Sequence, residues 1–274
     1  MAYVDGKVAA LTGAGSGIGR ALALQLNNDG CELFLSDISA ASLNETLALL
    51  PRQEVPAAGQ VLDVADKPSV YAWAEKIAEA KGRVDIVINN AGVALISNAE
   101  DNRHEDFEWL MGVNFWGVVY GTQAFLPLLR QSQQGHLVNI SSVFGLFSVP
   151  TQSAYNASKF AVRGYTEALR QEMEGSNVHV CCVHPGGIKT NIARAARSED
   201  SDINADKRDT EFQKLARTSP KKAAATIISA IEKRKKRALI GMDARFFSLM
   251  CRLFPVRYPR ILALLDRNAS ESLK

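Results

Sequence analysis

A tyrosine and a lysine in the middle of the chain have the types and spacing of a proton-transfer site. Tyr155 and Lys159 lie four residues apart, so on a helix they share one face. A phenol has a reference pKa of about 10, and a neighbouring ammonium favours the phenolate and lowers that value. The pair can therefore give or take a proton, as redox chemistry at an alcohol carbon requires. On its own, Tyr-x-x-x-Lys also occurs on solvated helix faces, but Ser142, thirteen residues before the tyrosine, and other motifs agree with it.

A glycine-rich turn near the N-terminus offers a place for a dinucleotide. Thr12–Gly19 follows a strand-like segment at Lys7–Leu11 and precedes a helical one at Arg20–Asn28. Its spacing is Gly-x-x-x-Gly-x-Gly rather than Gly-x-Gly-x-x-Gly, because Ile18 stands where the third glycine of the latter pattern would fall. Glycines permit a tight turn and close backbone approach, and the helix N-terminus offers N–H groups to a pyrophosphate. The alternative is a βα turn without a ligand.

An acidic residue follows where a ribose ligand is expected. Asp37 ends the predicted strand Glu32–Ser36, about twenty residues beyond the glycine turn. Its carboxylate could accept hydrogen bonds from the adenosine ribose hydroxyls and would repel a 2′-phosphate. A solvated helix cap is the other interpretation of this residue.

The segments that carry these residues alternate between strands and helices. Strands are predicted at residues 7–11, 32–36, 59–62, 83–88, 136–140, 177–183 and 238–241. Helices are predicted at 20–28, 41–50, 68–80, 105–129, around Tyr155 to Met173, and at 220–232. This order predicts an α/β fold, a Rossmann-type doubly wound parallel sheet of seven strands with helices on both faces, in a single domain. Ligands bind such sheets at the carboxyl ends of the strands, where Ser142 falls.

Composition restricts the class of protein. The 274 residues are 47% hydrophobic and 22% charged with a net charge of +3, which suits a globular protein and gives no reason to expect nucleic acid as a partner. No apolar run reaches the roughly 18 residues needed to span a bilayer, and no secretory signal is recognised. The four cysteines and four histidines lack metal-ligand spacing, so we expect no metal and a reducing, cytoplasmic location.

Three segments allow more than one interpretation. Asn114 lies among apolar residues of the 105–129 helix, so its amide needs a buried partner or the helix needs a local distortion. It is either a satisfied core amide or a residue that makes a backbone or water contact inside the active site. Residues 191–219 are polar and include the acidic patch 199–202, which suits either a mobile lid or a plain surface insertion. Residues 220–274 hold the last helix, the last strand and an Arg-laced apolar tail. The tail and the basic run Lys233–Arg237 could touch a membrane surface weakly, form an oligomer interface or cover the substrate mouth.

Together these motifs resemble those of the short-chain dehydrogenase/reductase family, in particular its NAD(P)-dependent secondary-alcohol and hydroxysteroid-type dehydrogenases. The resemblance covers roughly residues 6–190, the proposed cofactor-binding and catalytic core. It rests on Thr12–Gly19, Asp63, Asn89–Gly92, Asn114, Ser142, Tyr155 with Lys159, and Pro185-Gly186 followed by Thr190. It implies an oxidoreductase that transfers a hydride between a nicotinamide cofactor and an alcohol or ketone, and that assembles as a homodimer or homotetramer.

The resemblance also implies a role for each motif residue. Tyr155 would be the general acid or base, Lys159 would hold the nicotinamide ribose, Ser142 would bind the substrate oxygen, and Asn114 would anchor a water relay. The cofactor-binding residues would be Gly13, Ser16, Gly17, Ile18, Gly19, Asp37, Asp63, Val64, Asn90, Ala91, Gly92, Tyr155, Lys159, Pro185, Gly186, Ile188 and Thr190. NAD is expected rather than NADP, because Ser16 and Ile38 stand where NADP-preferring members usually carry a basic residue. Arg20 nearby could weaken that preference.

The substrate is expected to be bulky and apolar. Phe144 and Phe147 follow the catalytic serine and, with residues 191–217, would wall a mostly apolar pocket around Ser142 and Tyr155. From a different class, the alternative function is a non-catalytic dinucleotide-binding sensor or scaffold that kept the fold without turnover.

Overall fold

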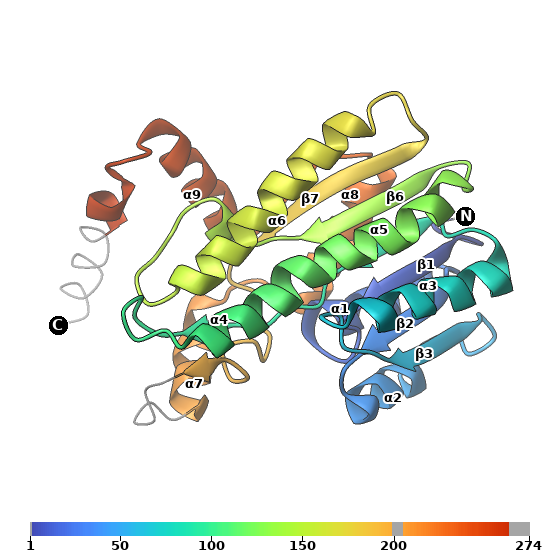
Figure 1. The fold of residues 1–274 in the computed structure, drawn as a ribbon, viewed down its shortest axis with the longest axis horizontal. Coiled ribbons are helices and arrows are strands. Elements are labelled where there is room, and N and C mark those ends of the chain that lie inside the picture. Colours follow the sequence, from blue (N-terminus) through green and yellow to red (C-terminus); the bar gives the residue numbers. More distant parts are fainter. Residues whose placement is uncertain (1, 199–204, 263–274) are drawn as a thin grey trace.

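Seven parallel strands form one sheet in the computed structural model, which describes residues 2–198 and 205–262. Their spatial order is β3-β2-β1-β4-β6-β7-β9 (Figure 1). The chain moves outward from β1 first in one direction and then in the other, so the sheet is doubly wound as predicted. The strands are β1 (Val8–Thr12), β2 (Glu32–Asp37), β3 (Ala57–Val61), β4 (Ile86–Asn89), β6 (Gly135–Ile140), β7 (Val178–Pro185) and β9 (Arg237–Ile240).

Helices cover both faces of the sheet (Figure 1). One layer holds α3 (Lys67–Lys81), α5 (Gly117–Arg130) and α6 (Ser153–Glu172), and the other holds α1 (Gly17–Asn28), α2 (Ala40–Ala48) and α8 (Pro220–Glu232). Every residue of β1, β4 and β6 is buried, as expected for central parallel strands with helices on both sides. The helix start predicted at Ser219-Pro220 is confirmed, because the Ser219 hydroxyl accepts a 3.2 Å hydrogen bond from the N–H of Lys222.

The helix predicted at 105–129 contains a change of winding. It consists of α4 (His104–Met111), a π-helical turn at Gly112–Trp116, and α5. A π turn holds one more residue than an α turn and occurs often at functional sites. Asn114 lies in this turn, so the local distortion expected at a buried mid-helix asparagine is present.

The polar segment 191–219 contains structure that its composition does not reveal. Helix α7 (Ala205–Leu215) fills its second half, and β8 (Arg197–Ser198) pairs in parallel with β5 (Leu95–Ile96) in a separate two-stranded sheet. The acidic patch 199–202 lies outside the described residues.

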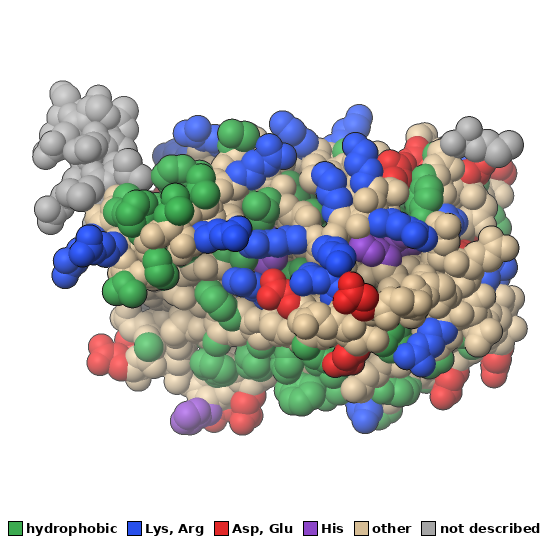
Figure 2. Space-filling model, turned by 90° about the horizontal axis from the view of Figure 1, so that it is seen from above, with side chains coloured by type: hydrophobic (Ala, Val, Ile, Leu, Met, Phe, Trp, Pro, Cys, Tyr) green, Lys and Arg blue, Asp and Glu red, His purple; other side chains and the backbone are tan. Residues whose placement is uncertain are grey.

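The C-terminal tail begins with α9 (Met242–Leu253), which packs beside β9 and the short 3₁₀ turn Val143–Gly145. On the face seen in Figure 2, apolar side chains gather at the end of the molecule that holds α9, next to a row of Lys and Arg side chains. None of the helices in 2–198 and 205–262 combines the length and apolar character that crossing a bilayer needs. Residues 263–274, the end of the Arg-laced apolar tail, lie outside the described part.

Candidate active site

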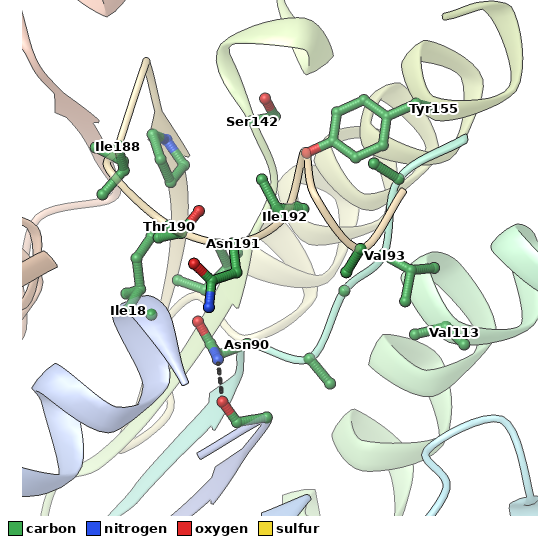
Figure 3. Close-up of a pocket in the computed structure, with 18 of the residues that line it drawn as sticks. Ile18, Asn90, Val93, Val113, Ser142, Tyr155, Ile188, Thr190, Asn191 and Ile192 are labelled. Atoms are coloured by element: carbon green, nitrogen blue, oxygen red, sulfur yellow. Dashed lines mark hydrogen bonds between the residues drawn. The ribbon is translucent and has the colours of Figure 1, made fainter. Parts of the chain in front are cut away.

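A cavity of about 560 Å³ opens at the carboxyl edge of the sheet. Its walls come from the residues that follow β1, β2, β4, β6 and β7, together with α6 and the segment after Gly187. In Figure 3, Tyr155 and Ser142 lie at one end and Ile18 and Asn90 at the other, with Thr190, Asn191 and Ile192 between them. The fold therefore brings the predicted proton-transfer residues and the glycine turn into one site.

The glycine turn forms one wall of this cavity. Gly13 has a φ of 66°, and a Cβ atom there would lie 2.8 Å from the Cα of Ala91, so a larger residue would displace the loop after β4. Gly13, Ser16, Gly17 and Ile18 line the cavity. Gly19 does not line the cavity. It packs against the carbonyl of Gly13, and its lack of a side chain lets α1 lie close to the turn.

Asp37 is held at the rim by backbone N–H groups. Its carboxylate accepts a 2.8 Å hydrogen bond from Gly15 and a 2.9 Å hydrogen bond from Ser39. These two bonds fix the carboxylate beside the turn and leave it among the residues that line the cavity. Asp37 is thus placed where a ribose hydroxyl could reach it, and it is not the side chain that caps α2, because Ser39 does so.

Arg20 is turned away from the cavity. Its guanidinium donates to the carbonyl of Gly15 at 2.6 Å and to the hydroxyl of Thr46 at 3.0 Å, and it forms a 2.7 Å ion pair with Glu45. With these partners it is absent from the cavity lining. The guanidinium of Arg20 is therefore already engaged outside the cavity.

The loop after β4 is pinned to β1 by a side chain that sequence reasoning did not single out. The Thr12 hydroxyl accepts hydrogen bonds of 3.0 Å and 3.1 Å from the N–H groups of Asn90 and Ala91. The Asn90 amide donates in turn to the carbonyls of Thr12 and Gly13. Nine of the residues expected to bind the cofactor line the cavity, namely Asp63, Val64, Asn90, Ala91, Gly92, Pro185, Gly186, Ile188 and Thr190.

Tyr155 and Lys159 are both buried, with exposed fractions of 8% and 3%. The Lys159 ammonium lies 5.7 Å from the centre of the Tyr155 ring and donates a 3.2 Å hydrogen bond to the carbonyl of Ile140. Burial lowers the pKa of Lys159 to about 8. Burial also raises the pKa of Tyr155, and hydrogen bonding to the Ser142 side chain opposes that rise only in part.

The sequence predicted a lowered pKa for Tyr155, whereas burial in this structure raises it. The ammonium faces the ring and is held by a main-chain carbonyl, while desolvation disfavours the charged form of both groups. The phenol is consequently protonated at neutral pH.

Ser142 is oriented by its neighbours in the turn after β6. Its side chain accepts a 3.1 Å hydrogen bond from the N–H of Phe144 and caps the 3₁₀ turn. Nδ1 of the buried His184 lies 3.0 Å from the Ser142 carbonyl, so this nitrogen carries the proton. Burial lowers the pKa of His184 to about 3, which keeps the ring neutral. His184 is structural, as predicted, but it supports a candidate catalytic residue.

Asn114 is a satisfied buried amide behind the cavity wall. Its oxygen accepts a 2.8 Å hydrogen bond from the N–H of Val93, and its nitrogen donates to the Val93 carbonyl at 3.0 Å and to Ser158 at 3.1 Å. Both expectations for this residue, a partner and a distortion, are met. A Cβ atom on Gly92 would lie 3.3 Å from both the Asn114 oxygen and the Lys159 ammonium, so the glycine lets the two approach each other.

The expectation for Phe147 needs correction. Phe144 lines the cavity and Phe147 does not. Phe147 lies beyond the end of the 3₁₀ turn and is buried under α9 and the residues after it, with its ring centre 4.7 Å from that of Phe247. The apolar wall opposite the glycine turn includes Ile192 and Phe212, which belong to the segment 191–217 expected to wall the pocket. It is completed by residues that the sequence did not indicate, namely Ile96, Trp109 and Val113.

The start of the predicted lid is fastened across this apolar wall. Arg197 forms a 2.7 Å ion pair with Asp106, and its guanidinium lies 3.7 Å from the centre of the Trp109 ring. The β5–β8 pairing fixes the backbone at the same place. Asn191, Ile192, Ala193 and Ala195 thereby line the cavity.

A further residue missed in the sequence, Asp243, supports the loop after β7. Its carboxylate accepts a 2.6 Å hydrogen bond from the N–H of Gly187 and fills the space that a Cβ atom on Gly186 would need. No local pattern marks Asp243, because it contacts this loop only through the docking of α9.

Comparisons with known proteins agree with this site. The sequence model of the family described as short chain dehydrogenase matches residues 7–201. SadH of Mycobacterium tuberculosis, named as a candidate oxidoreductase, is 45% identical over 265 residues, which cover 96% of each chain. A Burkholderia phymatum short-chain dehydrogenase/reductase in complex with NAD has a TM-score of 0.85 and 32% identity, and covers 93% of this chain and 95% of its own. A Mycobacterium paratuberculosis short chain dehydrogenase bound to NAD has a TM-score of 0.74 and 28% identity, and covers 86% of this chain and 96% of its own.

The doubly wound sheet, the glycine turn and these relatives define an oxidoreductase with a Rossmann-type fold. The chain belongs to the short-chain dehydrogenase/reductase family.

Proposed function

We propose that this protein transfers a hydride between NAD and a bulky, apolar secondary alcohol or ketone, with Tyr155 as the general acid and base. The observation that carries the proposal is the convergence of Ser142, Tyr155 and Lys159 at one end of a cavity whose other end is the glycine turn. A bound nicotinamide dinucleotide would supply or accept the hydride.

The residues of the cavity fit such a dinucleotide. The pyrophosphate would lie on the N-terminus of α1 beside Ser16 and Ile18, where unpaired N–H groups and the helix dipole favour negative charge. A Cβ atom on Gly13 would narrow this part of the cavity against Ala91. Asp37 would accept from the ribose hydroxyls, and Ile188 and Thr190 would meet the carboxamide end.

Proton transfer would run through the phenol of Tyr155. Because its pKa is raised, the hydroxyl is protonated at neutral pH and can donate to the oxygen of a ketone. The Ser142 hydroxyl, which interacts with this phenol, would hold the same oxygen. In the direction of alcohol oxidation the phenol must first lose its proton, which the positive charge of Lys159 would favour.

We propose NAD rather than NADP as the preferred cofactor. A 2′-phosphate would meet the fixed carboxylate of Asp37, and the nearest guanidinium, that of Arg20, is engaged by Gly15, Thr46 and Glu45. Turnover measured with NAD and NADP at matched concentrations tests this preference. A tenfold advantage for NADP would show that Asp37 does not decide it.

The substrate class follows from the apolar wall. Phe144, Trp109 and Val113 face the cavity near Tyr155, and Ile192 and Phe212 add apolar surface from the segment after the catalytic core. We propose that this segment covers the substrate. A panel of secondary alcohols, read by NADH absorbance, should give higher kcat/KM for cyclic and long-chain alcohols than for small polar hydroxy acids. The reverse order would contradict the proposal.

The alternative is a dinucleotide-binding sensor or scaffold without turnover. The presence of Ser142, Tyr155 and Lys159 together in one cavity favours the enzyme. A purified chain that binds NAD with ordinary affinity but reduces or oxidises no member of the alcohol and ketone panel would favour the sensor.

We also propose that the chain forms a homodimer or homotetramer. Trp116 and Phe160 are 47% and 39% exposed, and the Trp116 ring stacks on that of Tyr120, 5.9 Å away, so apolar surface lies on the outer side of the α5 and α6 layer. Light scattering after size-exclusion chromatography would measure the mass, and a monomer at micromolar concentration would contradict this.

A further inference from the structure

Helix α9 presents a continuous apolar stripe to solvent. Met242, Phe246, Leu249 and Leu253 follow one another at intervals of four, three and four residues, which places them on one face of the helix. Phe254 and Val256 extend the stripe beyond the helix end. These six side chains are between 46% and 86% exposed.

The opposite face of α9 is the one that folding requires. Ala244 and Met250 are buried, Phe247 stacks on Phe147, and Asp243 binds the loop after β7. The core therefore already fixes the helix, and the outer stripe adds nothing to its packing. Contiguous apolar surface of this kind marks an interaction site rather than a folding requirement.

Arginines border the stripe. Arg245, Arg252, Arg257 and Arg260 lie in the same stretch, and none of them forms an ion pair with a residue in 2–198 or 205–262. The one acid in 242–260, Asp243, points inward to Gly187. Arg237 on β9 donates a 3.3 Å hydrogen bond to the Ser248 hydroxyl on α9, so the cationic surface continues from α9 onto β9. Figure 2 shows the row of cationic side chains on the face that also holds the apolar patch.

We propose that the outer face of α9, with the arginines beside it, docks on an anionic phospholipid bilayer. Apolar side chains on one helix face can enter the boundary between headgroups and acyl chains, while guanidinium groups bind lipid phosphates. The proposal concerns the outer face of α9, which does not line the cavity, and it does not depend on the proposed reaction.

The charge pattern favours a membrane over a second copy of this chain. In a two-fold interface built on α9, each arginine-bordered stripe would face an identical one, and like charges would repel. An anionic bilayer satisfies both the arginines and the apolar stripe at once.

Vesicle flotation of the full chain tests the proposal. We expect binding to vesicles of phosphatidylcholine with about one quarter phosphatidylglycerol at physiological salt, and at least tenfold less binding to pure phosphatidylcholine. Raising the salt concentration should weaken binding, because the arginine contribution is screened.

Two variants separate the apolar contribution to vesicle binding from the cationic one, and both variants change only exposed side chains. Phe246→Ser with Leu249→Ser and Leu253→Ser should lower the bound fraction at least tenfold, and Arg245→Glu with Arg252→Glu should do the same. The matched controls are Leu49→Ser with Val61→Ser, exposed apolar residues near the other edge of the sheet, and Lys221→Glu with Lys222→Glu at the start of α8. Both controls should bind as the parent does.

Three outcomes would overturn the proposal. The first is no binding of the parent chain to anionic vesicles, and the second is equal loss of binding in the control variants. The third is a change of oligomeric mass in the α9 variants without any vesicle binding of the parent, which would assign the stripe to an interface between copies.

Discussion

The two ends of the cavity are built in different ways. At the cofactor end, Thr12, Asp37 and Asn90 hold the loops together by hydrogen bonds between side chains and the main chain, all within a few residues of strand ends. At the proposed substrate end, apolar side chains from α4, the segment after β7 and α7 form the wall itself, and polar contacts such as the Arg197–Asp106 ion pair and the Gln213–Thr190 hydrogen bond fasten the segments around it. A site fixed by hydrogen bonds tolerates few side chains, whereas an apolar wall can exchange residues of similar size. We therefore expect changes at the cofactor end to alter binding sharply and changes at the substrate end to alter selectivity.

The largest expected effect is at the point where the two ends meet. Tyr155→Phe removes the proton donor and should lower kcat by about 10²–10⁴, because general acid–base catalysis contributes about this much. The affinity for NAD, measured by fluorescence titration, should stay within about threefold. Tyr71→Phe on α3, which removes a phenol far from the cavity, is the control and should leave kcat unchanged. Full activity in Tyr155→Phe would refute the proposed role.

Lys159→Met should lower activity and raise stability. Its ammonium is buried, and its pKa falls from 10.5 to about 8, so between these values the unfolded chain binds more protons than the folded one. The buried charge of Lys159 therefore lowers the free energy of unfolding by its full amount below pH 8. This cost disappears as the pH rises from 8 to 10.5. Removing the charge should raise the unfolding free energy at pH 7 by about 1–3 kcal/mol, while kcat falls about 100-fold.

Denaturant titration at pH 7 and at pH 10 measures this linkage. The gain from Lys159→Met should shrink at the higher pH, and Lys76→Met, an exposed lysine on α3, should show neither effect. A destabilised Lys159→Met variant at pH 7 would mean that the hydrogen bond to Ile140 outweighs the cost of the buried charge. In the parent enzyme, kcat for ketone reduction should decline above about pH 8, because Lys159 loses the positive charge that favours the phenolate left when Tyr155 gives up its proton.

At the cofactor end, Asp37→Ala should raise the KM for NAD by about tenfold, the equivalent of one good hydrogen bond to a charged group. The KM for NADP should change little or fall, since the carboxylate that opposes a 2′-phosphate is gone. Glu75→Ala, an exposed acid on α3, is the control. An equal rise of both KM values would show that Asp37 acts by holding Gly15 and Ser39 rather than by contacting ribose.

At the substrate end, a pair of phenylalanines in one turn should give opposite results. Phe144→Ala should change kcat/KM for bulky alcohols by up to about tenfold with a small loss of stability, because Phe144 lines the cavity. Phe147→Ala should leave selectivity unchanged and cost about 3–5 kcal/mol of unfolding free energy, because Phe147 is a core residue beneath α9. Equal shifts of selectivity in both variants would remove this distinction.

The difference between the two ends also explains what could be predicted from the sequence. Gly13, Asp37 and Ser142 are marked by short motifs at strand ends, and parallel topology alone brings those ends to one edge. Trp109, Ile192 and Phe212 carry no such mark, because they meet only after three separate segments have packed together. The position of Phe147 could not be predicted because α9, which covers it, comes from a distant part of the chain, and the direction of the Tyr155 pKa shift depends on burial, which a linear pattern does not show.

The π-helical turn at Gly112–Trp116 bears on how this chain should be compared with distant relatives. Such a turn accommodates one residue more than regular α geometry, so deleting a single residue there would leave α4 and α5 as one uninterrupted helix. Because the extra residue is absorbed within the turn, this deletion would leave the side chains of α4 and α5 on the faces that they now present. Asn114, which lies in the turn itself, would lose its alignment with Val93 and Ser158. A one-residue deletion in this stretch would therefore perturb the position of the asparagine while sparing the helices on either side.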